Sequence, residues 1–309
     1  MEKIPDIAIV IPAFDAVNLH KTLESIVLQA DSGVRVYVAD DASPADIASI
    51  VADFEPRLDI RHHRFEENMG QKSMLRHLRR CIDLVGEEWT VVLSDDNELA
   101  PKALRRLRRA MGKRKEFDVY HWDTDIIDTD GNLVRKTRRY PRKTTSGKLF
   151  KDIYLNDAVA PLSSFVFRTV VLKEKYVEDA EAWRMDLATI LSCAAMSGIR
   201  TVWRGTVLWR EKAAGTSMRI DMDEKVALSS VRLFRWSEFF FGENYPLGTS
   251  DRLYFYAEAL AALYPTYTKE ELKEMMGEFG FVSGTVRKMR ASSALKSAIK
   301  DREAALRQK

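Results

Sequence analysis

The sequence VYVADDAS at residues 36–43 runs from apolar side chains straight into two adjacent carboxylates, Asp40 and Asp41. A second segment, WTVVLSDD at residues 89–96, also ends in a pair of aspartates. Short continuous apolar runs of this kind are typical of strands that are buried on both faces of a sheet. Each of these two strands is therefore expected to present carboxylates where it ends.

Segments with helical spacing lie between the expected strands. Apolar residues recur with a helical period at residues 19–29, 45–54 and 71–84, and other strand-like runs occupy residues 7–11 and 58–62. Strands that alternate with helices of this length predict an α/β fold, built on a doubly wound and mostly parallel sheet.

The two aspartate pairs are expected to lie at one edge of that sheet. In doubly wound sheets, ligands bind outside the carboxyl ends of the strands. Grouping several carboxylates is costly unless a cation or hydrogen-bond donors lie among them. Mg²⁺ is usually held by one or two carboxylates together with substrate phosphates, and Mn²⁺ prefers similar oxygen ligands. Capping of the following helix explains either pair alone equally well, but the two pairs together favour a metal site.

Composition narrows the class of protein. The chain has 309 residues, of which 46% are hydrophobic and 31% charged, as is typical of a globular protein. Cys81 and Cys193 are far apart and provide neither a disulfide framework nor a paired metal motif, which favours a reducing compartment. We find no signal peptide and no apolar run long enough to span a membrane, so we expect a cytoplasmic protein. The net charge of +3 is too small to indicate a nucleic-acid partner.

The pattern changes near residue 218. Residues 119–167 are irregular, with strand-like pieces, and a helix is expected at residues 186–196. After residue 218 the helical patterns are rich in aromatic and charged side chains, and strand alternation disappears. We therefore expect an α/β domain over residues 1–218 and a helical C-terminal extension over residues 219–309.

Five motifs in the first 100 residues resemble those of family-2 glycosyltransferases, which have the GT-A fold. In chain order they are IVIPAFD (9–15), TLESIVLQ (22–29), VYVADDAS (36–43), NMG (68–70) and LSDDN (93–97), the last in the place of the Asp-x-Asp element. Fainter likenesses follow in WRMDL (183–187) and in the segment 209–217. The resemblance thus covers residues 4–218 and leaves the last 90 residues outside it.

The resemblance implies that a sugar is transferred with inversion from a nucleoside-diphosphate donor, with UDP as the expected nucleotide, to a glycan or lipid-linked hydroxyl acceptor. Mn²⁺ or Mg²⁺ is the implied cofactor, Asp96 its ligand and Asp186 the general base. Asp41 is expected to bind the base or the ribose, and Asp95 the ribose side. The remaining expected donor-site residues are Pro12, Ala13, Phe14, Asn68, Arg76 and Lys212.

Three positions depart from the family pattern. Ser94 replaces the first aspartate of the Asp-x-Asp element, Lys212 or a neighbour replaces a histidine, and Met185 replaces the acidic residue before Asp186. These departures leave open a non-catalytic module that binds a nucleotide-sugar or a protein partner. Asp186 also fits a helix N-cap, and Arg76 fits an ordinary position on a helix surface.

Other enzymes with doubly wound sheets fit the sequence less well. A dinucleotide-dependent dehydrogenase would need Gly-x-Gly-x-x-Gly after the first strand, where this chain has PAFD at residues 12–15. A sugar nucleotidyltransferase would need a glycine-rich basic loop at the same place, and none is evident.

The C-terminal tail is basic and amphipathic. Leu295, Ile299 and Leu306 recur along one side of a helix over residues 286–309, among many lysines and arginines. Such a helix either packs on its own domain or a second subunit, or lies on an anionic membrane surface. The apolar stripe is narrow and lacks Trp and Phe, which favours packing over peripheral membrane contact.

Overall fold

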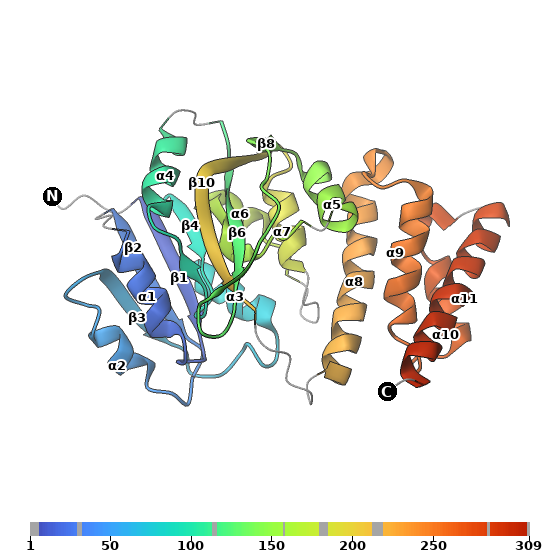
Figure 1. Ribbon diagram of the computed structural model, residues 1–309, viewed down its shortest axis with the longest axis horizontal. Coiled ribbons are helices and arrows are strands. Elements are labelled where there is room, and N and C mark those ends of the chain that lie inside the picture. Colours follow the sequence, from blue (N-terminus) through green and yellow to red (C-terminus); the bar gives the residue numbers. More distant parts are fainter. Residues whose placement is uncertain are drawn as a thin grey trace. The chain divides into compact units, whose positions relative to one another are not determined.

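The computed structural model describes residues 6–29, 33–112, 116–156, 158–178, 185–211, 219–282 and 285–307. By its internal contacts the chain divides into two compact units. The first consists of Met1–Ala180 and Thr189–Ala213, and the second of Glu181–Ala188 and Ala214–Lys309. The described strands all lie in the first unit, and the described part of the second is helical (Figure 1).

One ten-stranded mixed sheet organises the first unit. Its main path runs in the order β3-β2-β1-β4-β9-β6-β10-β5, while β7 pairs with β6 and β8 with β10. The six strands β1, β2, β3, β4, β6 and β10 point the same way, whereas β9 and β5 are antiparallel to their neighbours. The strands are β1 (Ile7–Ala13), β2 (Val34–Asp40), β3 (Asp59–Arg64), β4 (Trp89–Val92), β5 (Glu98–Leu99), β6 (Val119–Ile127), β7 (Leu133–Lys136), β8 (Lys143–Thr144), β9 (Phe165–Arg168) and β10 (Ile199–Arg210).

Helices follow the strands as the apolar periodicity predicts. Side-chain caps begin several of them: Asp46 accepts from the Ser49 N–H at 3.0 Å, and Ser73 and Thr145 cap their helices in the same way. The helices with residues in the first unit are α1 (Leu19–Val27), α2 (Ile47–Ala52), α3 (Met74–Asp83), α4 (Ala103–Met111), α5 (Ser146–Leu155), the 3₁₀ turn η1 (Leu162–Ser164), α6 (Thr169–Lys175) and α7 (Met185–Cys193). The α/β fold with a mostly parallel sheet is thus confirmed.

The central strands are buried on both faces. Every residue of β4 is buried, as are all of β1 except Pro12 and all of β2 except Arg35. Branched apolar side chains such as Ile9, Val36 and Val91 fill the core between the sheet and its helices. The long strand β6 differs from the irregular segment expected at residues 119–127. His121, Asp123 and Asp125 interrupt its apolar pattern, and they are buried in contact with residues 139–140 and, for His121, with Phe165.

The second unit is a helical assembly with an aromatic core. The ring centroid of Tyr256 lies 4.4 Å from that of Phe234 and 4.2 Å from that of Phe279. Figure 1 shows α9, α10 and α11 side by side, in orange and red. The helices are α8 (Arg219–Phe241), η2 (Gly242–Asn244), α9 (Thr249–Ala261), α10 (Lys269–Gly277), η3 (Gly280–Val282) and α11 (Thr285–Arg307).

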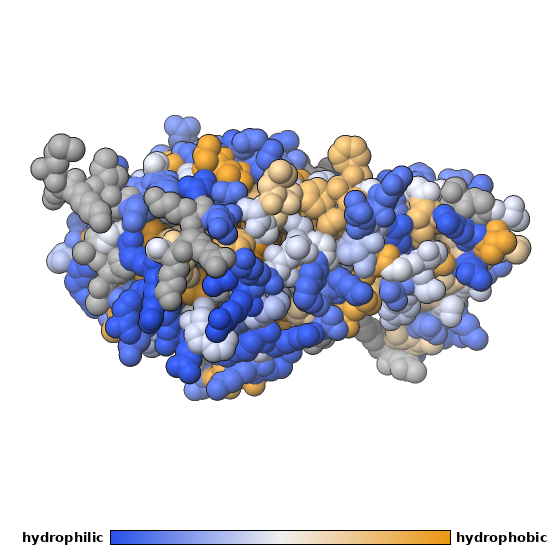
Figure 2. Space-filling view, turned by 90° about the horizontal axis from the view of Figure 1, so that it is seen from above, coloured by the Kyte–Doolittle hydropathy of each residue, from blue (hydrophilic) through white to orange (hydrophobic). Residues whose placement is uncertain are grey.

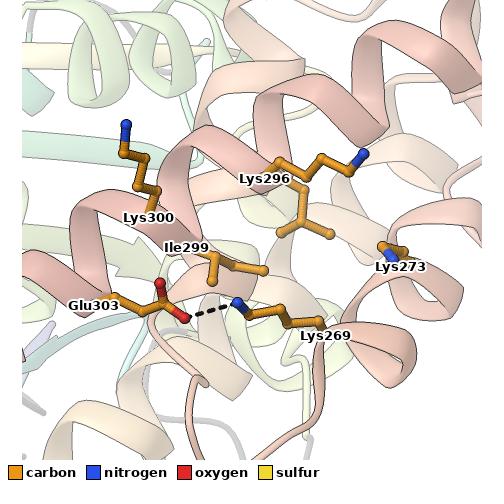
Figure 3. Close-up of a pocket in the computed structure, with 7 residues that line it drawn as sticks. Lys269, Lys273, Lys296, Ile299, Lys300 and Glu303 are labelled. Carbon is orange, nitrogen blue, oxygen red and sulfur yellow. Dashed lines mark ion pairs between the residues drawn. The ribbon is translucent and has the colours of Figure 1, made fainter.

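The apolar stripe of α11 is used within this unit. Leu295 and Ile299 are buried, and the helix contacts both α9 and α10. Beside them lies a groove of about 270 Å³ with a rim of lysines (Figure 3). One of these, Lys269, pairs with Glu303 at 2.7 Å. Val286, Met289 and Leu306 of the same helix stay exposed, and peripheral membrane contact or self-association stays a prediction.

Within the described residues, no helix combines the length and the apolar character that a membrane span requires. On the face shown in Figure 2, hydrophilic and hydrophobic residues are interspersed.

Gly205 in β10 is required by the packing of a buried tryptophan. A Cβ at this position would lie 2.3 Å from Cδ1 of Trp122, whose side chain is fully buried. We expect Gly205→Ala to lower the free energy of unfolding by about 1–3 kcal/mol, the usual cost of overpacking a core. Urea denaturation followed by circular dichroism measures this change. Gly277→Ala is the control, because a Cβ there meets no atom within 4 Å. Equal stabilities for the two variants would contradict the expectation.

Candidate functional site

The loop after β1 is tied to the end of β4 by one carboxylate. Asp95 Oδ2 accepts hydrogen bonds from the backbone N–H groups of Phe14 and Asp15, both at 3.0 Å. The backbone oxygen of Asp95 also accepts from Thr22 Oγ1, on α1, at 3.0 Å. A charged acceptor shared by two adjacent N–H groups is a strong constraint on a loop. Asp95 therefore fixes the loop that carries Phe14, whose side chain is 39% exposed.

The end of β2 is tied to the same loop. The Asp41 N–H donates to the Ala13 carbonyl at 2.9 Å, and Ser43 Oγ donates to the Phe14 carbonyl at 2.6 Å. Asp40 is fully buried, accepts from the Ser43 N–H at 2.8 Å and pairs with Arg64 at 2.6 Å. Asp40 thus shapes the turn, while the ends of β1, β2 and β4 meet at one edge, as expected of a parallel sheet.

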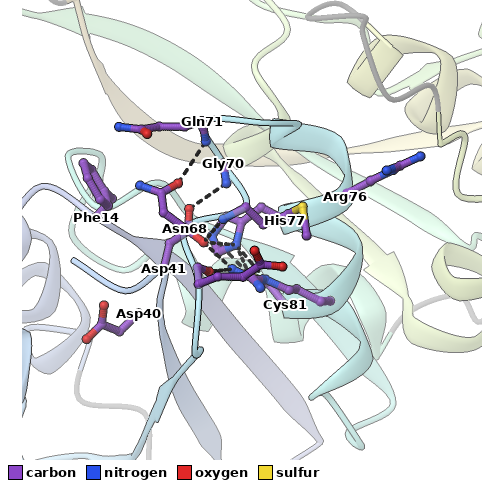
Figure 4. Close-up of polar contacts among 12 residues, drawn as sticks. Phe14, Asp40, Asp41, Asn68, Gly70, Gln71, Arg76, His77 and Cys81 are labelled. Carbon is purple, nitrogen blue, oxygen red and sulfur yellow. Dashed lines mark hydrogen bonds and ion pairs between the residues drawn. The ribbon is translucent and has the colours of Figure 1, made fainter.

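Asp41 is buried and holds a second loop (Figure 4). Its Oδ1 accepts from the Met69 N–H at 2.8 Å and its Oδ2 from the Gly70 N–H at 2.7 Å. The guanidinium of Arg80 pairs with the same carboxylate. In this arrangement Asp41 acts on the loop at residues 68–70 and is only 2% exposed, so its predicted direct contact with a nucleotide stays a prediction.

His77 completes the cluster around Asp41. Its Nδ1 lies 3.2 Å from Asp41 Oδ1 and accepts from Arg80 Nε at 3.2 Å. Burial, opposed by the Asp41 carboxylate and reinforced by the charge of Arg80, lowers the pKa of His77 to about 4. The imidazole is therefore neutral near pH 7, and Arg80 is the cation that pairs with Asp41 among the residues the structure describes.

Asp96 lies where β4, β6 and β10 end. Its backbone oxygen accepts from Arg210 Nε at 2.9 Å, and the same guanidinium donates to the carbonyls of Asp128 and Thr129 at 2.7 and 2.9 Å. Arg210 is 3% exposed and also pairs with Glu98. Arg210 thus holds the segment that presents the half-buried Asp96 next to the loop after β6.

The oxygen ligands at this edge suit a metal ion that is held partly by the protein and partly by the substrate. No group of three or more His, Cys, Asp or Glu side chains in the described part of the chain could hold a metal by itself. A divalent cation held by one carboxylate and by substrate phosphates needs only Asp96 from the protein. Ser94 adds no carboxylate, and its hydroxyl lies 3.3 Å from that of Ser163. The residues present therefore fit a metal that binds together with a diphosphate.

Three predicted residues need separate description. Arg76 points away from Asp41 in Figure 4, and its Nε lies 3.6 Å from Glu178 Oε1. Asp186 lies in the first turn of α7, in the part of that helix assigned to the second unit, where its Oδ1 accepts from the Leu187 N–H at 2.9 Å. Lys212 lies outside the described residues.

Two arginines of the site escaped the sequence reasoning. Arg80 is four residues after Arg76 on the same helix face, and a buried aspartate at the end of a strand is itself a signal that a cation lies nearby. Arg210 closes the segment WR at residues 209–210, whose likeness to the family was noted without assigning the arginine a role. Asn68 lies in the loop held by Asp41 and accepts from the Gln71 N–H at 2.9 Å.

Comparison with known proteins decides the family. Residues 8–174 match the family model described as Glycosyl transferase family 2. The chain belongs to glycosyl transferase family 2. The strands and helices that carry Asp41, Asp95 and Asp96 all lie inside the matched region. Among curated proteins, none matches this sequence.

Solved structures similar to this family-2 glycosyltransferase include TarS from S. aureus. A crystal structure of TarS 1-349 in complex with UDP-GlcNAc has a TM-score of 0.63 at 15% identity, over 98% of this chain and 92% of that one. The complex of TarS 1-349 with UDP has a TM-score of 0.55 at 12% identity, over 97% and 92% of the two chains. At such identities the likeness establishes the GT-A fold, including C-terminal helices.

We expect the stability of this family-2 glycosyltransferase to fall as the pH is lowered from about 6.5 to about 4, partly through His77. In that range the unfolded chain binds a proton at His77 that the folded chain excludes, because its pKa is lowered to about 4. Urea denaturation at a series of pH values measures the fall. His77→Gln should make it smaller, while His20→Gln, which changes an exposed histidine, should not. An unchanged profile in His77→Gln would contradict this assignment.

Proposed function

We propose that this family-2 glycosyltransferase transfers a sugar, with inversion, from a UDP-sugar to a hydroxyl group of a glycan or lipid-linked acceptor. The observation that carries the proposal is the Asp95–Asp96 pair. One carboxylate anchors the loop after β1, and its neighbour lies at the edge where β4, β6 and β10 end. The choice of UDP is supported by the TarS complexes with UDP-GlcNAc and UDP.

The nucleotide side of the site is assigned to the loops after β1 and β3. Pro12, Ala13 and Phe14 end β1 and begin its loop, and Figure 4 shows Phe14 and Asn68 on the same side of Asp41. The exposed ring of Phe14 offers a flat face to a base or a ribose. Asp41 contributes by holding the loop of Asn68 at a fixed distance from Phe14, and Asp95 by holding Phe14 itself.

The diphosphate side of the site is assigned to Asp96 with Mn²⁺ or Mg²⁺. A divalent cation stabilises the negative charge that develops on a leaving diphosphate. Asp96 would supply the protein ligand, while Arg210 keeps the Asp96 backbone in place through its bond to the carbonyl. Because Arg210 is buried and also bonds the loop after β6, that loop and the metal ligand are held as one rigid edge.

The general base is assigned to Asp186. The acceptor hydroxyl must lose its proton as it attacks, and a carboxylate within hydrogen-bond reach assists this transfer. A single base opposite the leaving group implies direct displacement and inversion, whereas glycoside hydrolysis typically uses two flanking carboxylates. The position of Asp186 in WRMDL at residues 183–187 supports the assignment through the sequence resemblance alone.

We expect UDP to bind more tightly in the presence of Mn²⁺, and Asp96→Ala to remove that gain. Isothermal titration calorimetry with UDP, GDP and dTDP, each with and without Mn²⁺, measures both effects. The matched control is Asp53→Ala, which removes an exposed carboxylate at the end of α2 and should bind as the unaltered chain does. Unchanged Mn²⁺-dependent affinity in Asp96→Ala would overturn the metal assignment. Tighter binding of GDP than of UDP would overturn the donor assignment.

We expect Asp186→Asn to keep UDP affinity and to lower sugar transfer by about 10²–10⁴-fold, the usual contribution of a general base. Release of UDP from UDP-GlcNAc, measured with a panel of glycan acceptors, reports the rate. The side chains of Asp and Asn are nearly the same size, so the fold should persist. Glu174→Gln on α6 is the control, because it neutralises an exposed carboxylate without touching the site. Transfer by Asp186→Asn at the unaltered rate would return Asp186 to a structural role.

A further inference from the structure

The first unit contains a cavity beside the middle of β6 and β10. Its volume is about 430 Å³, within the usual range of ligand pockets. Its wall includes Asp123 from β6, Arg139 and Arg142 from the segment before β8, and Trp203 and Arg204 from β10. None of these residues takes part in the donor site described above.

A bulge in β10 builds one wall of this cavity. The parallel pairing of β10 with β6 shifts register between Thr201 and Thr206, and Arg204 within the bulge has a left-handed φ of 62°. This conformation is unfavourable for a residue with a Cβ, so the surrounding structure must hold it. The bulge turns Trp203 outward, where it is 64% exposed. Bulges of this kind frequently re-aim side chains next to functional sites.

The cavity carries an excess of positive charge. Arg139 is balanced by Asp125 at 2.9 Å. By contrast, no carboxylate in the described part of the chain lies within ion-pair distance of Arg142 or Arg204. The Arg142 guanidinium lies instead 5.4 Å from the centroid of the Trp203 ring. Arginine binds phosphate and carboxylate groups through paired N–H donors, so this wall suits an anion.

The rest of the wall suits a polyhydroxylated molecule. Asp123 is 7% exposed, and its Oδ1 accepts from the Tyr140 N–H at 3.0 Å. Burial raises the pKa of this carboxyl group. Thr201 and Thr206 add hydroxyl groups, and Trp203 adds an aromatic face on which the C–H side of a sugar ring can pack. Hydroxyl acceptors, an aromatic face and two unbalanced arginines together match a sugar or polyol that carries an anionic group.

The cavity lies away from the reacting edge. Asp123 is four residues before Ile127, where β6 ends, which corresponds to about 13 Å along the strand. The loop after Ile127 is bonded through Arg210 to the backbone of Asp96. A ligand in the cavity would therefore sit more than one sugar ring away from the end of β6, where the proposed donor site lies.

We propose that this cavity binds an anionic unit of an extended acceptor, a sugar or polyol that carries a phosphate or carboxylate group. Its reacting hydroxyl would lie at the donor site while a neighbouring unit occupies the cavity. The assignment to the acceptor rests on the proposed glycosyltransferase function, whereas binding of the anionic unit does not. The cavity selects the charge of the acceptor, and the donor site carries out the transfer.

Binding is tested on the full chain without donor, by saturation-transfer NMR with glucose 6-phosphate, glucuronic acid and glucose. Inorganic phosphate, which has no C–H protons to observe, is measured as a competitor of the glucose 6-phosphate signal. Glucose 6-phosphate or glucuronic acid should bind at least about tenfold more tightly than glucose, as expected for hydrogen bonds to a charged group. Tighter binding of the phosphate ester indicates a phosphorylated acceptor, and tighter binding of the uronic acid indicates a carboxylated one. The proposal is overturned if glucose, or inorganic phosphate, binds as tightly as the preferred anionic sugar.

Variants place the ligand in the cavity. Arg142→Gln and Arg204→Gln should each weaken binding of the preferred probe by about tenfold or more, while Arg105→Gln, on the exposed face of α4, should not. UDP should not displace the probe. Displacement by UDP, or unchanged binding in both cavity variants, overturns the proposal. Calorimetry with UDP separately tests the donor site, so the two functions fail independently.

Discussion

Strand β1 pairs in parallel with β2 on one side and with β4 on the other, and the candidate site depends on this pairing. The register sets Ala13 opposite Asp40 and Val10 opposite Val92. Parallel strands end at the same edge of a sheet, so the residues that follow β1, β2 and β4 must lie together. Because all three strands are buried on both faces, a one-residue slip of register would exchange the side chains packed on the two faces, and the edge is therefore fixed by the core.

Two carboxylates at this edge, one buried and one half-buried, accept hydrogen bonds from backbone N–H groups of neighbouring loops. Asp95 accepts from two adjacent N–H groups of the loop after β1, and Asp41 accepts from two adjacent N–H groups of the loop after β3. Each carboxylate thereby replaces water for a pair of loop donors and stiffens the loop. In the proposed donor site the two loops are thereby held in place without a nucleotide, which would lower the entropic cost of binding one.

Most of the first hundred residues could be assigned to strands and helices from the sequence, because each segment shows either a continuous apolar run or a helical spacing of apolar residues. The strand β6 could not, because His121, Asp123 and Asp125 break the apolar pattern. These side chains are buried against Arg139, Tyr140 and Phe165, which come from other segments of the chain. The cavity beside β6 was missed for the same reason, since its wall joins three segments and a bulge that no local pattern reveals.

The sequence by itself determined the family, the mostly parallel sheet and the edge at which the aspartates gather, because strand ends and their polar residues are local features of the chain. Only the tertiary structure decided what each side chain does there. It buried Asp41, paired it with Arg80, set Arg76 beside Glu178, and bonded Arg210 to the backbone of Asp96. These outcomes depend on which side chains share a buried volume. Which side chains meet is decided by how segments that are far apart in the sequence pack to within a few ångströms, and the spacing of residues along the chain does not reveal this.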